Sequence, residues 1–585
     1  MYEWACFLVS HPITSGPVSR VAIRLVPVPN LENHRCWLDA VRSVSVAKAQ
    51  CFSEDDRAIL TIVPQQLTAW VENYNPFNTT TVLPTVIDFM YEPLVVFNRL
   101  NSNEPHFRLA ESFELADDLA SITFTLREGL MWSDGEPLTA DDVVFTYDYI
   151  KQFPALDFIS VSAQLASVEK IDDRTVRFNL NEPNSLIANT IVGMPIVPEH
   201  IWADIEDPVT FANENPVGSG PMTEITRFTP QVYEQCANPH YWDADNLDVD
   251  CLRMPQLADN PQVLAALADG TLDWATSFIP DIDNTFVAKD PEHHKYWFTP
   301  SSLVSFQISM TTPDENNRKA FNDVDFRRAL SMLIDRQTII DIAGYGYPLI
   351  NEDPAMLGEL YKSFANPEVE AEFGQYGRFD LEAGMALLDE AGYVDADGDG
   401  FRDNPDGSPI AIDIMVPNGW TDWIDAVQIS MESLTEAGLN VKMSTPEAAV
   451  WTSGLISGEY SMTLNALASA ANPYFPYIRS FNPNDFGKSR FTAPHWENEE
   501  VMDLLEQYTQ IKDPAEATEV MDQIQMIVAE AMPVIPVYNS PSFYQYNTSR
   551  FTGWADADNP KFSPVVSNAN PARLLQLLDL EPVAQ

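Results

Sequence analysis

The sequence predicts a globular protein of the mixed α/β class. Short apolar or alternating runs typical of strands recur along the chain, as at 58–63, 122–127 and 175–180. Between such runs lie helical patterns, in which an Asp, Asn or Thr precedes the apolar face and a glycine often follows it. Prolines number 44 among 585 residues, so many loops and extended connections are expected.

Each predicted helix is recognised by its ends. Thr139 and Asp142 form the two halves of a capping box before an apolar face. Asn260 and Pro261 begin a helix that stops at Gly270. The same pattern of ends predicts helices over 325–344, 380–392, 422–438 and 513–531.

The charge balance excludes several classes of function. Asp and Glu number 86 against 33 Lys and Arg, which gives a net charge of −53. Such a field repels nucleic acids and anionic membrane surfaces, so neither is expected as a partner. Hydrophobic residues make up 45% of the chain, which excludes a disordered protein. The acidic excess is spread along the chain and favours solubility in a salty medium, with steering of a cationic ligand as the alternative.

The first 57 residues do not fit the pattern of the rest. No run of 18 apolar residues occurs, so no transmembrane helix is predicted. Residues 1–16 lack the positive start of a signal peptide, and Asp39 and Arg42 interrupt the apolar run before Ala47-Lys48-Ala49. We interpret 1–57 as a poorly ordered leader or a misassigned start, in which a signal sequence is not clearly present.

The five cysteines contain no C-x-x-C pair, which argues against a thiolate metal site. Cys236 and Cys251 flank a turn-rich stretch between two predicted neighbouring strands. A disulfide there would stabilise the fold by about 3 kcal/mol in an oxidising compartment. The sequence leaves this bond open.

No enzyme signature is present in the sequence. His293 and His294 are adjacent rather than at helical spacing, and no G-x-S-x-G occurs. The run Gly218-Ser219-Gly220-Pro221 lacks the G-K-[ST] that holds a nucleotide phosphate. We therefore expect no enzymatic activity.

An acidic loop matches much of the EF-hand calcium pattern. Its carboxylates stand at loop positions 1, 3, 5, 9 and 12, with Gly400 at position 6. The alternative is a solvated acidic turn between a helix ending near Gly392 and a strand near 410–416. The candidate calcium ligands are Asp395, Asp397, Asp399, Phe401, Asp403 and Asp406.

Several motifs resemble a known family. The stretch from Trp132 to Phe145, WSDGEPLTADDVVF, resembles the signature of the family-5 extracytoplasmic solute-binding proteins of ABC importers, the peptide, nickel and oligosaccharide group. The other matching motifs follow in family order: Asn75-Pro76-Phe77, Tyr91-Glu92-Pro93-Leu94, Asn215 to Pro221, Asn238 to Trp242, Gly270 to Trp274, and Phe326 to Leu330 with Ile334-Asp335-Arg336.

The resemblance implies a two-lobed α/β fold of the periplasmic-binding-protein type (type II, cluster C), with a hinge and an extra inserted domain. The implied division is a leader over 1–57, a discontinuous first lobe over 58–99, 190–300 and 530–585, an inserted domain over 100–189 and a second lobe over 301–529. Such proteins close over a ligand by hinge motion, and a membrane permease reads the closed form.

The implied role is that of the extracytoplasmic substrate-binding component of an ABC importer. A monomer of this kind delivers its solute to a permease with separate ATPase subunits and needs neither a catalytic residue nor a cofactor. Two alternatives are a secreted hydrolase with a polar cleft and a ligand-sensing subunit of a membrane receptor. Nickel and haem are disfavoured as ligands because the eight histidines are scattered.

The implied solute is an oligosaccharide or an oligopeptide. Peptide-binding relatives hold the amino group of the peptide with an Asp, and the aligned position here falls near Ser469, in a run without a carboxylate. This departure favours sugar, and aromatic faces in Gly- and Pro-marked loops suit sugar stacking. The candidate binding residues are Trp420, Trp423, Tyr474, Asn472, Phe278 and Trp451.

Overall fold

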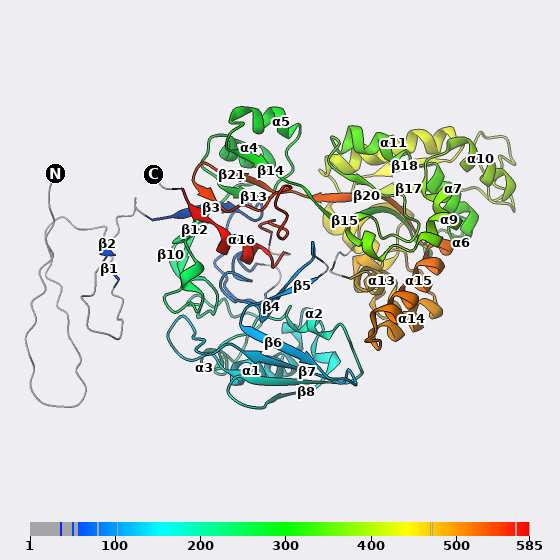
Figure 1. Ribbon diagram of the computed structural model, residues 1–585. Coiled ribbons are helices and arrows are strands. Elements are labelled where there is room, and N and C mark those ends of the chain that lie inside the picture. The colour runs from blue at the N-terminus through cyan, green and yellow to red at the C-terminus, as the bar shows by residue number, and fades with distance from the viewer. Residues whose placement is uncertain are drawn as a thin grey trace, which may run out of the picture. The chain divides into compact units, whose positions relative to one another are not determined.

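The computed structural model describes residues 36–37, 50–51, 57–78, 81–101, 103–467, 470, 472–567 and 570–583. The chain divides into two compact units, 1–57 and 58–585. In the first, β1 (Cys36–Trp37) pairs antiparallel with β2 (Gln50–Cys51). Most of the predicted leader and Ser469 lie outside the described residues. Residues 58–585 form the second unit (Figure 1).

A seven-stranded sheet forms around the first predicted strand. All five residues of β3 (Ile59–Val63) are buried, and β3 pairs in parallel with both β12 and β13. The apolar run predicted at 58–63 is therefore a central strand. The strand order is β10 (Met222–Thr229), β11 (Val232–Ala237), β12 (Cys251–Pro255), β3, β13 (Trp274–Ala275), β21 (Gln545–Asn547) and β14 (His294–Tyr296).

A six-stranded mixed sheet forms the second large layer. Its strand β15 is paired antiparallel with β20 on one side and β19 on the other, whereas β17 pairs in parallel with β18 and β19. The strand order is β16 (Leu349–Ile350), β20 (Val534–Ser542), β15 (Thr299–Ile308), β19 (Met462–Ala466), β17 (Ile412–Met415) and β18 (Val441–Ser444).

Two short segments connect the large sheets. Residues 297–298 join β14 to β15, and residues 543–544 join β20 to β21. The segments run side by side, because the Trp297 N–H donates to the Tyr544 carbonyl at 3.0 Å. Since β20 lies in the six-stranded sheet, we propose that the chain returns between the lobes at 543–544 rather than at the predicted 530. Figure 1 shows β15 and β20 leading from one sheet toward the other.

A smaller antiparallel sheet carries the inserted segment. Strands β7 (Ser121–Leu126) and β9 (Thr175–Leu180) lie between β6 (Ala110–Leu115) and β8 (Leu165–Lys170). Every second residue of β7 is buried, as the alternating sequence predicts. Two further pairs are β4 (Val95–Asn98) with β5 (Glu104–Phe107), and β22 (Phe551–Thr552) with β23 (Glu581–Pro582).

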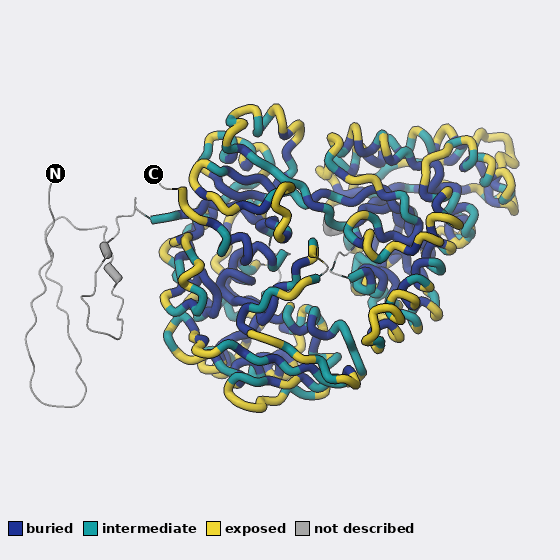
Figure 2. Tube along the Cα trace, viewed as in Figure 1, coloured by how far each residue is buried: buried dark blue, intermediate teal, exposed yellow. Residues whose placement is uncertain are grey.

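Helices surround these sheets. The central strands β3, β15 and β20 are largely buried, and Figure 2 shows many of the exposed residues at the periphery of residues 58–585. Among the residues that the structure describes, none of the helices combines the length and hydrophobicity that a membrane span needs. The bounds are α1 Ala140–Gln152, α2 Ile187–Ile191, α3 Glu199–Trp202, α4 Asn260–Ala268, α5 Ile282–Thr285, α6 Glu315–Asn322, α7 Val324–Met332, α8 Arg336–Thr338, α9 Pro367–Gly377, α10 Leu381–Glu390, α11 Thr421–Glu436, α12 Ala448–Ser457, α13 Tyr474–Phe481, α14 Glu499–Thr509, α15 Pro514–Ala531 and α16 Arg573–Asp579.

The predicted capping box is confirmed at the start of α1. The Asp141 N–H donates to the Thr139 hydroxyl at 3.2 Å, and the Thr139 N–H donates to the Asp142 carboxylate at 2.9 Å. The helix predicted over 325–344 is corrected, because α7 ends at Met332. The Asp335 carboxylate accepts the Thr338 N–H at 3.0 Å and so caps a separate helix, α8.

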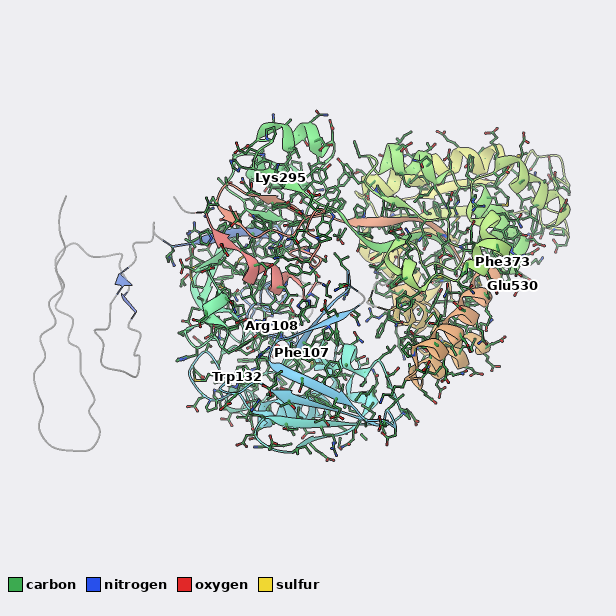
Figure 3. All side chains as sticks on the ribbon, viewed as in Figure 1. Phe107, Arg108, Trp132, Lys295, Phe373 and Glu530 are labelled. Carbon is green, nitrogen blue, oxygen red and sulfur yellow. A yellow bond between two sulfur atoms is a disulfide. The ribbon has the colours of Figure 1, made fainter. Side chains whose placement is uncertain are left out.

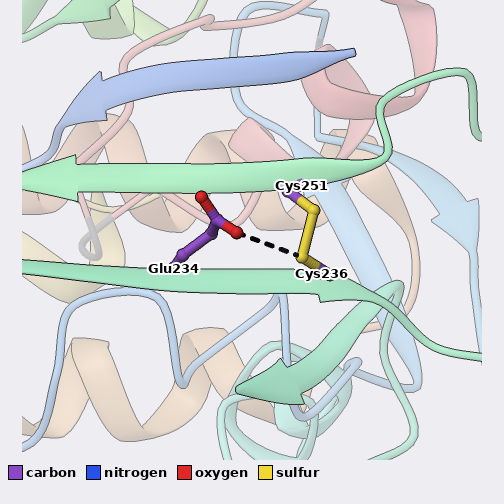
Figure 4. A group of neighbouring side chains, drawn as sticks. All are labelled: Glu234, Cys236 and Cys251. Carbon is purple, nitrogen blue, oxygen red and sulfur yellow. Dashed lines mark hydrogen bonds between the residues drawn. A yellow bond between two sulfur atoms is a disulfide. The ribbon is translucent and has the colours of Figure 1, made fainter. Parts of the chain in front are cut away.

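The two cysteines of β11 and β12 form a disulfide. Cys236 and Cys251 are direct partners in the antiparallel ladder and are bonded to each other. A Glu234 carboxylate oxygen lies 3.9 Å from the Cys236 sulfur, and Figure 4 shows the Glu234 side chain pointing toward the disulfide. Because a bonded sulfur carries no proton, we interpret this approach as a contact rather than a donated hydrogen bond. Because the two sulfurs are bonded to each other, neither cysteine is available as a thiolate ligand for a metal ion.

Changing Cys236 and Cys251 together to serine should lower the free energy of unfolding by about 3 kcal/mol. The bond closes a loop with a sequence separation of 15, which restricts the unfolded chain. Urea denaturation of the variant and the wild type, both without reductant, measures the difference. A variant as stable as the wild type would show that the bond does not form in the purified protein.

Candidate functional site

A cavity of about 390 Å³ is the candidate ligand site. One wall comes from residues 76–99, around β4, and from residues 189–195, at the end of α2. The opposite wall comes from residues 470–479, which lead into and form α13. The two walls belong to the parts of the chain that hold the two large sheets, so a ligand in this cavity contacts both.

The cavity wall carries two arginines and one carboxylate. Arg99 follows β4, Arg479 lies on α13, and both side chains are exposed to the cavity. Asp88 is the carboxylate among the lining residues, but it is buried and accepts a hydrogen bond from Arg573 Nε at 2.9 Å. The free charge of the cavity is therefore positive.

Three predicted tryptophans form one cluster at the start of α11 and along α12. The ring centroids of Trp420 and Trp423 are 4.8 Å apart, and Trp451 lies 5.7 Å from Trp420. Trp423 and Trp451 are buried, whereas Trp420 remains 41% exposed. Trp420 precedes the first turn of α11 and offers a rigid apolar surface supported from behind by the other two rings.

Polar groups surround the tryptophan cluster. The Trp451 indole N–H donates to the Thr463 hydroxyl at 2.9 Å. The Arg490 guanidinium lies 5.6 Å from the Trp451 ring centroid and donates to the Asn465 side-chain oxygen at 2.6 Å. Burial raises the pKa of the half-buried Asp422 carboxyl beside these rings. The buried polar groups hold the cluster in place, and the exposed apolar face of Trp420 suits a sugar ring.

Tyr474 and Asn472 lie together, but their side chains serve the fold. Asn472 Nδ2 donates to the Tyr508 hydroxyl at 2.9 Å, and Asn472 Oδ1 accepts the Tyr474 N–H at 2.8 Å. The Tyr474 ring stacks on Tyr508 with centroids 6.0 Å apart. Phe475, the next residue, lines the cavity instead. The run N-P-Y-F-P-Y marked this loop but did not identify which ring faces the cavity.

Phe278 belongs to a third group of side chains, near the segments that cross between the sheets. Its ring lies 5.9 Å from Tyr345 and 5.6 Å from Phe543. No ring contact joins Phe278 to the tryptophans among the described aromatic residues. The six predicted binding residues therefore fall into three groups.

Three carboxylates of the acidic loop lie close together, as a calcium site requires. Asp395, Asp397 and Asp403 each place a carboxylate oxygen within 4.8 Å of the others. The Asp395 carboxylate also accepts the Gly398 N–H at 2.7 Å and the Gly400 N–H at 3.0 Å. Three converging oxygens are a partial ligand set for calcium, which takes six to eight.

The other predicted ligands of this loop lie apart from that group. The Asp399 carboxylate accepts the Phe401 N–H at 2.8 Å. Asp406 Oδ2 accepts a hydrogen bond from Lys319 Nζ at 2.7 Å, and this pairing lowers the pKa of Asp406. The carboxylate at loop position 12 is thus engaged with α6 rather than with the loop.

Comparison with known proteins identifies a matching family. Residues 104–488 match the family described as bacterial extracellular solute-binding proteins, family 5 Middle. Protein XP55 of Streptomyces lividans is 30% identical over 410 residues, which cover 68% of this chain and 70% of that protein.

Solved structures match over most of the chain. A periplasmic oligopeptide-binding protein of an oligopeptide ABC transporter from Thermotoga maritima is 26% identical, with a TM-score of 0.81, and the match covers 90% of this chain and 99% of that one. The structure of the Thermotoga maritima protein with bound mannohexaose is 27% identical, with a TM-score of 0.76, and covers 91% and 100%. These matches confirm the predicted two-lobed α/β fold.

Proposed function

Because the chain belongs to the bacterial extracellular solute-binding proteins of family 5, we propose that it binds an oligosaccharide between its two lobes. The chain is a substrate-binding component of an ABC importer, as the sequence motifs predicted. Its family is a class of binding proteins rather than of enzymes. The identity of the solute is the part that we propose.

The exposed Trp420 ring is the observation that carries the oligosaccharide proposal. Its neighbours Trp423 and Trp451 are buried, so Trp420 is held in place with one surface free. Pyranose rings present apolar faces that stack on such surfaces. The mannohexaose bound by the similar Thermotoga maritima protein supports the same ligand class.

An oligopeptide is the second candidate solute. Its support is that the similar Thermotoga maritima protein is described as oligopeptide-binding. The sequence between Asn465 and Tyr474 contains no Asp or Glu, which argues against recognition of a free peptide amino group. A peptide would therefore be held through its backbone and its other end.

We propose that a membrane permease with separate ATPase subunits receives the solute and that the protein acts as a monomer outside the cytoplasm. Transport energy then comes from the ATPase, so the binding protein only has to capture and release. The secreted-hydrolase alternative requires bond cleavage, and the sensor alternative requires a receptor partner. Recovery of chemically unchanged solute after long incubation would exclude the hydrolase.

A thermal-shift screen tests the ligand class. Manno- and cello-oligosaccharides are compared with mixed tri- to pentapeptides at equal concentration, because a ligand that binds the folded state raises its stability by RT ln(1 + [L]/Kd). We expect at least one oligosaccharide to raise the melting temperature. Stabilisation by peptides alone would favour the second candidate, and no shift with any compound would reject both.

Changing Trp420 to alanine should weaken oligosaccharide binding by about tenfold, or ~1.4 kcal/mol. The loss arises because the stacking surface disappears while the buried Trp423 and Trp451 stay in place. Calorimetric titration measures it, with Phe379→Ala as control, since Phe379 is exposed to a similar extent, at 40%, but is not part of the tryptophan cluster. Equal affinities of the Trp420 variant and the wild type would place the sugar elsewhere.

We also propose that the acidic loop binds a structural calcium ion through Asp395, Asp397 and Asp403. Chelation should then lower the melting temperature of the wild type but not of an Asp395→Asn, Asp397→Asn variant. Asp406→Asn is the control, because Asp406 pairs with Lys319 and should leave the chelator effect intact. A wild type that is insensitive to chelator would show that the loop is a solvated acidic turn.

A further inference from the structure

Two arginines of the cavity have no partner in the described part of the chain. Arg99 and Arg479 line the same cavity from opposite walls, and neither makes an ion pair or a hydrogen bond with any residue that the structure describes. The chain has 86 Asp and Glu to only 33 Lys and Arg. Acidic partners for a guanidinium are thus abundant, and two unpaired arginines in one cavity need an explanation.

The cavity wall itself does not neutralise this charge. Asp88 is the acidic residue among those lining the cavity, and it is committed to the buried Arg573. Between residues 57 and 583, none of the undescribed positions is Asp or Glu in the sequence. The nearest carboxylate along the chain from Arg99, that of Glu104, accepts a hydrogen bond from Asn101 Nδ2 at 2.6 Å, and the described cavity wall offers the two arginines no free carboxylate.

The Tyr361 hydroxyl acts electrostatically on both arginines that line the cavity. Burial lowers the pKa of Arg99; the Tyr361 hydroxyl opposes this change, and the positive charge of Arg479 adds to it. Burial likewise lowers the pKa of Arg479, again opposed by Tyr361. The Tyr361 hydroxyl donates to the carbonyl of Ala470, another lining residue, at 2.9 Å. The positive charge of Arg479 thus acts on Arg99 across the cavity that both side chains line.

We propose that Arg99 and Arg479 together bind a carboxylate group of the transported solute. This inference rests on the proposed function, because it assigns a second subsite for the same solute, in the cavity rather than at Trp420. A guanidinium binds a carboxylate through two parallel hydrogen bonds, and the group supplies the missing counter-charge for both arginines. Because one arginine comes from each wall, a carboxylate between them links the two lobes when the solute is bound.

The net charge makes such a subsite necessary for an acidic solute. A protein with a net charge of −53 repels an anion at long range. At physiological salt this repulsion is screened beyond about 8 Å, so a local pair of positive charges decides the affinity. The carboxylate has two possible sources, a uronic acid of an oligosaccharide or the carboxyl end of a peptide.

Two matched pairs of probes test the proposal on the full chain by calorimetric titration. Hexamannuronate is compared with mannohexaose, and a pentapeptide with its C-terminal amide. We expect the carboxylate member of one pair to bind at least tenfold more tightly than its neutral partner. The pair that shows this preference identifies the source of the carboxylate.

The variants Arg99→Gln and Arg479→Gln should reduce that preference toward equal affinity, and Arg99→Lys should keep part of it. Arg177→Gln is the matched control, since Arg177 is an exposed arginine of β9 outside the cavity. The melting temperature without ligand checks that each variant folds. Arg99→Lys covers the case in which a glutamine variant fails to fold.

Two results would overturn this inference alone. They are equal binding of charged and neutral members in both pairs, and a preference that survives in the Arg99→Gln, Arg479→Gln double variant. If no probe binds the wild type at all, the proposed ligand classes fail together with the inference. The neutral probes thus separate failure of the arginine subsite from failure of the proposed function.

Discussion

Replacing Arg573 with methionine is expected to lower the free energy of unfolding by about 3–5 kcal/mol. The Arg573 side chain is fully buried and donates to the buried Asp88 carboxylate at 2.9 Å. It also donates to the carbonyls of Pro84 at 2.8 Å and Ile87 at 2.7 Å, and its guanidinium lies 4.7 Å from the Phe89 ring centroid. Removing it leaves a buried carboxylate without its counter-charge.

This contact joins distant parts of the chain, since α16 is held against the segment before β4. Urea denaturation followed by tryptophan fluorescence measures the loss. Lys512→Met is the matched control: it breaks the exposed pair with Asp117, whose side chains are 53% and 103% exposed, and should cost less than about 1 kcal/mol. A similar small loss in both variants would contradict the structural role of Arg573. Adding Asp88→Asn to the Arg573 variant should recover part of the loss.

Replacing Glu92 with glutamine should cost a similar amount, about 3–5 kcal/mol. The buried Glu92 carboxylate accepts hydrogen bonds from Arg108 Nε at 2.7 Å, the Tyr241 hydroxyl at 2.9 Å and the Trp242 indole at 2.7 Å. A glutamine has one acceptor oxygen fewer and turns an N–H₂ group toward these donors. Arg108, labelled in Figure 3, would lose its fully buried counter-charge and keep only the Asp243 carboxylate, 3.0 Å away.

The control for this variant is Glu111→Gln, which breaks a pair with Arg174 whose side chains are 45% and 38% exposed. It should leave stability within about 1 kcal/mol. Denaturation midpoints compare the two Glu→Gln changes directly. If the Glu92 variant proved as stable as the Glu111 variant, the buried network would not hold these segments together.

The Glu92 network explains why sequence motifs identified the fold. Glu92 belongs to the run Tyr91 to Leu94, whereas Tyr241 and Trp242 belong to the run Asn238 to Trp242. The two runs meet at the buried Glu92 carboxylate, whose hydrogen bonds are completed by side chains of the second run. Local signals such as the capping box at Thr139 were also sufficient, because their hydrogen bonds span only a few residues.

Other features of the fold were set by contacts that no local pattern contains. The helix predicted to run from Asp325 to Gly344 is divided because Asp335 caps a new turn, although the apolar period continues through it. The return of the chain between the lobes was predicted at 530, whereas β20 pairs with β15 through Ser542. Strand pairing over such separations depends on tertiary packing rather than on local sequence.

The site was predictable only where its residues are close in sequence. Trp420 and Trp423 are neighbours on one helix start, and they lie together as a loop rich in aromatics suggests. Arg99 and Arg479 stand far apart in the sequence, and nothing in their neighbours marks them as one pair. Phe278 has the aromatic ring and Asp406 the carboxylate that their predicted roles require. In the structure, the Phe278 ring packs against Phe543, and Asp406 forms an ion pair with Lys319.

Equilibrium dialysis with mass analysis tests the central claim, which is the capture of an intact oligomeric solute between two lobes. The full chain is dialysed against a mixture of mannohexaose, hexamannuronate and a pentapeptide. The molecular masses of the retained compounds are then measured by mass spectrometry. We expect one retained oligomer per chain, released on denaturation with its original mass. Retention of none of them, or recovery of shorter fragments, would contradict it.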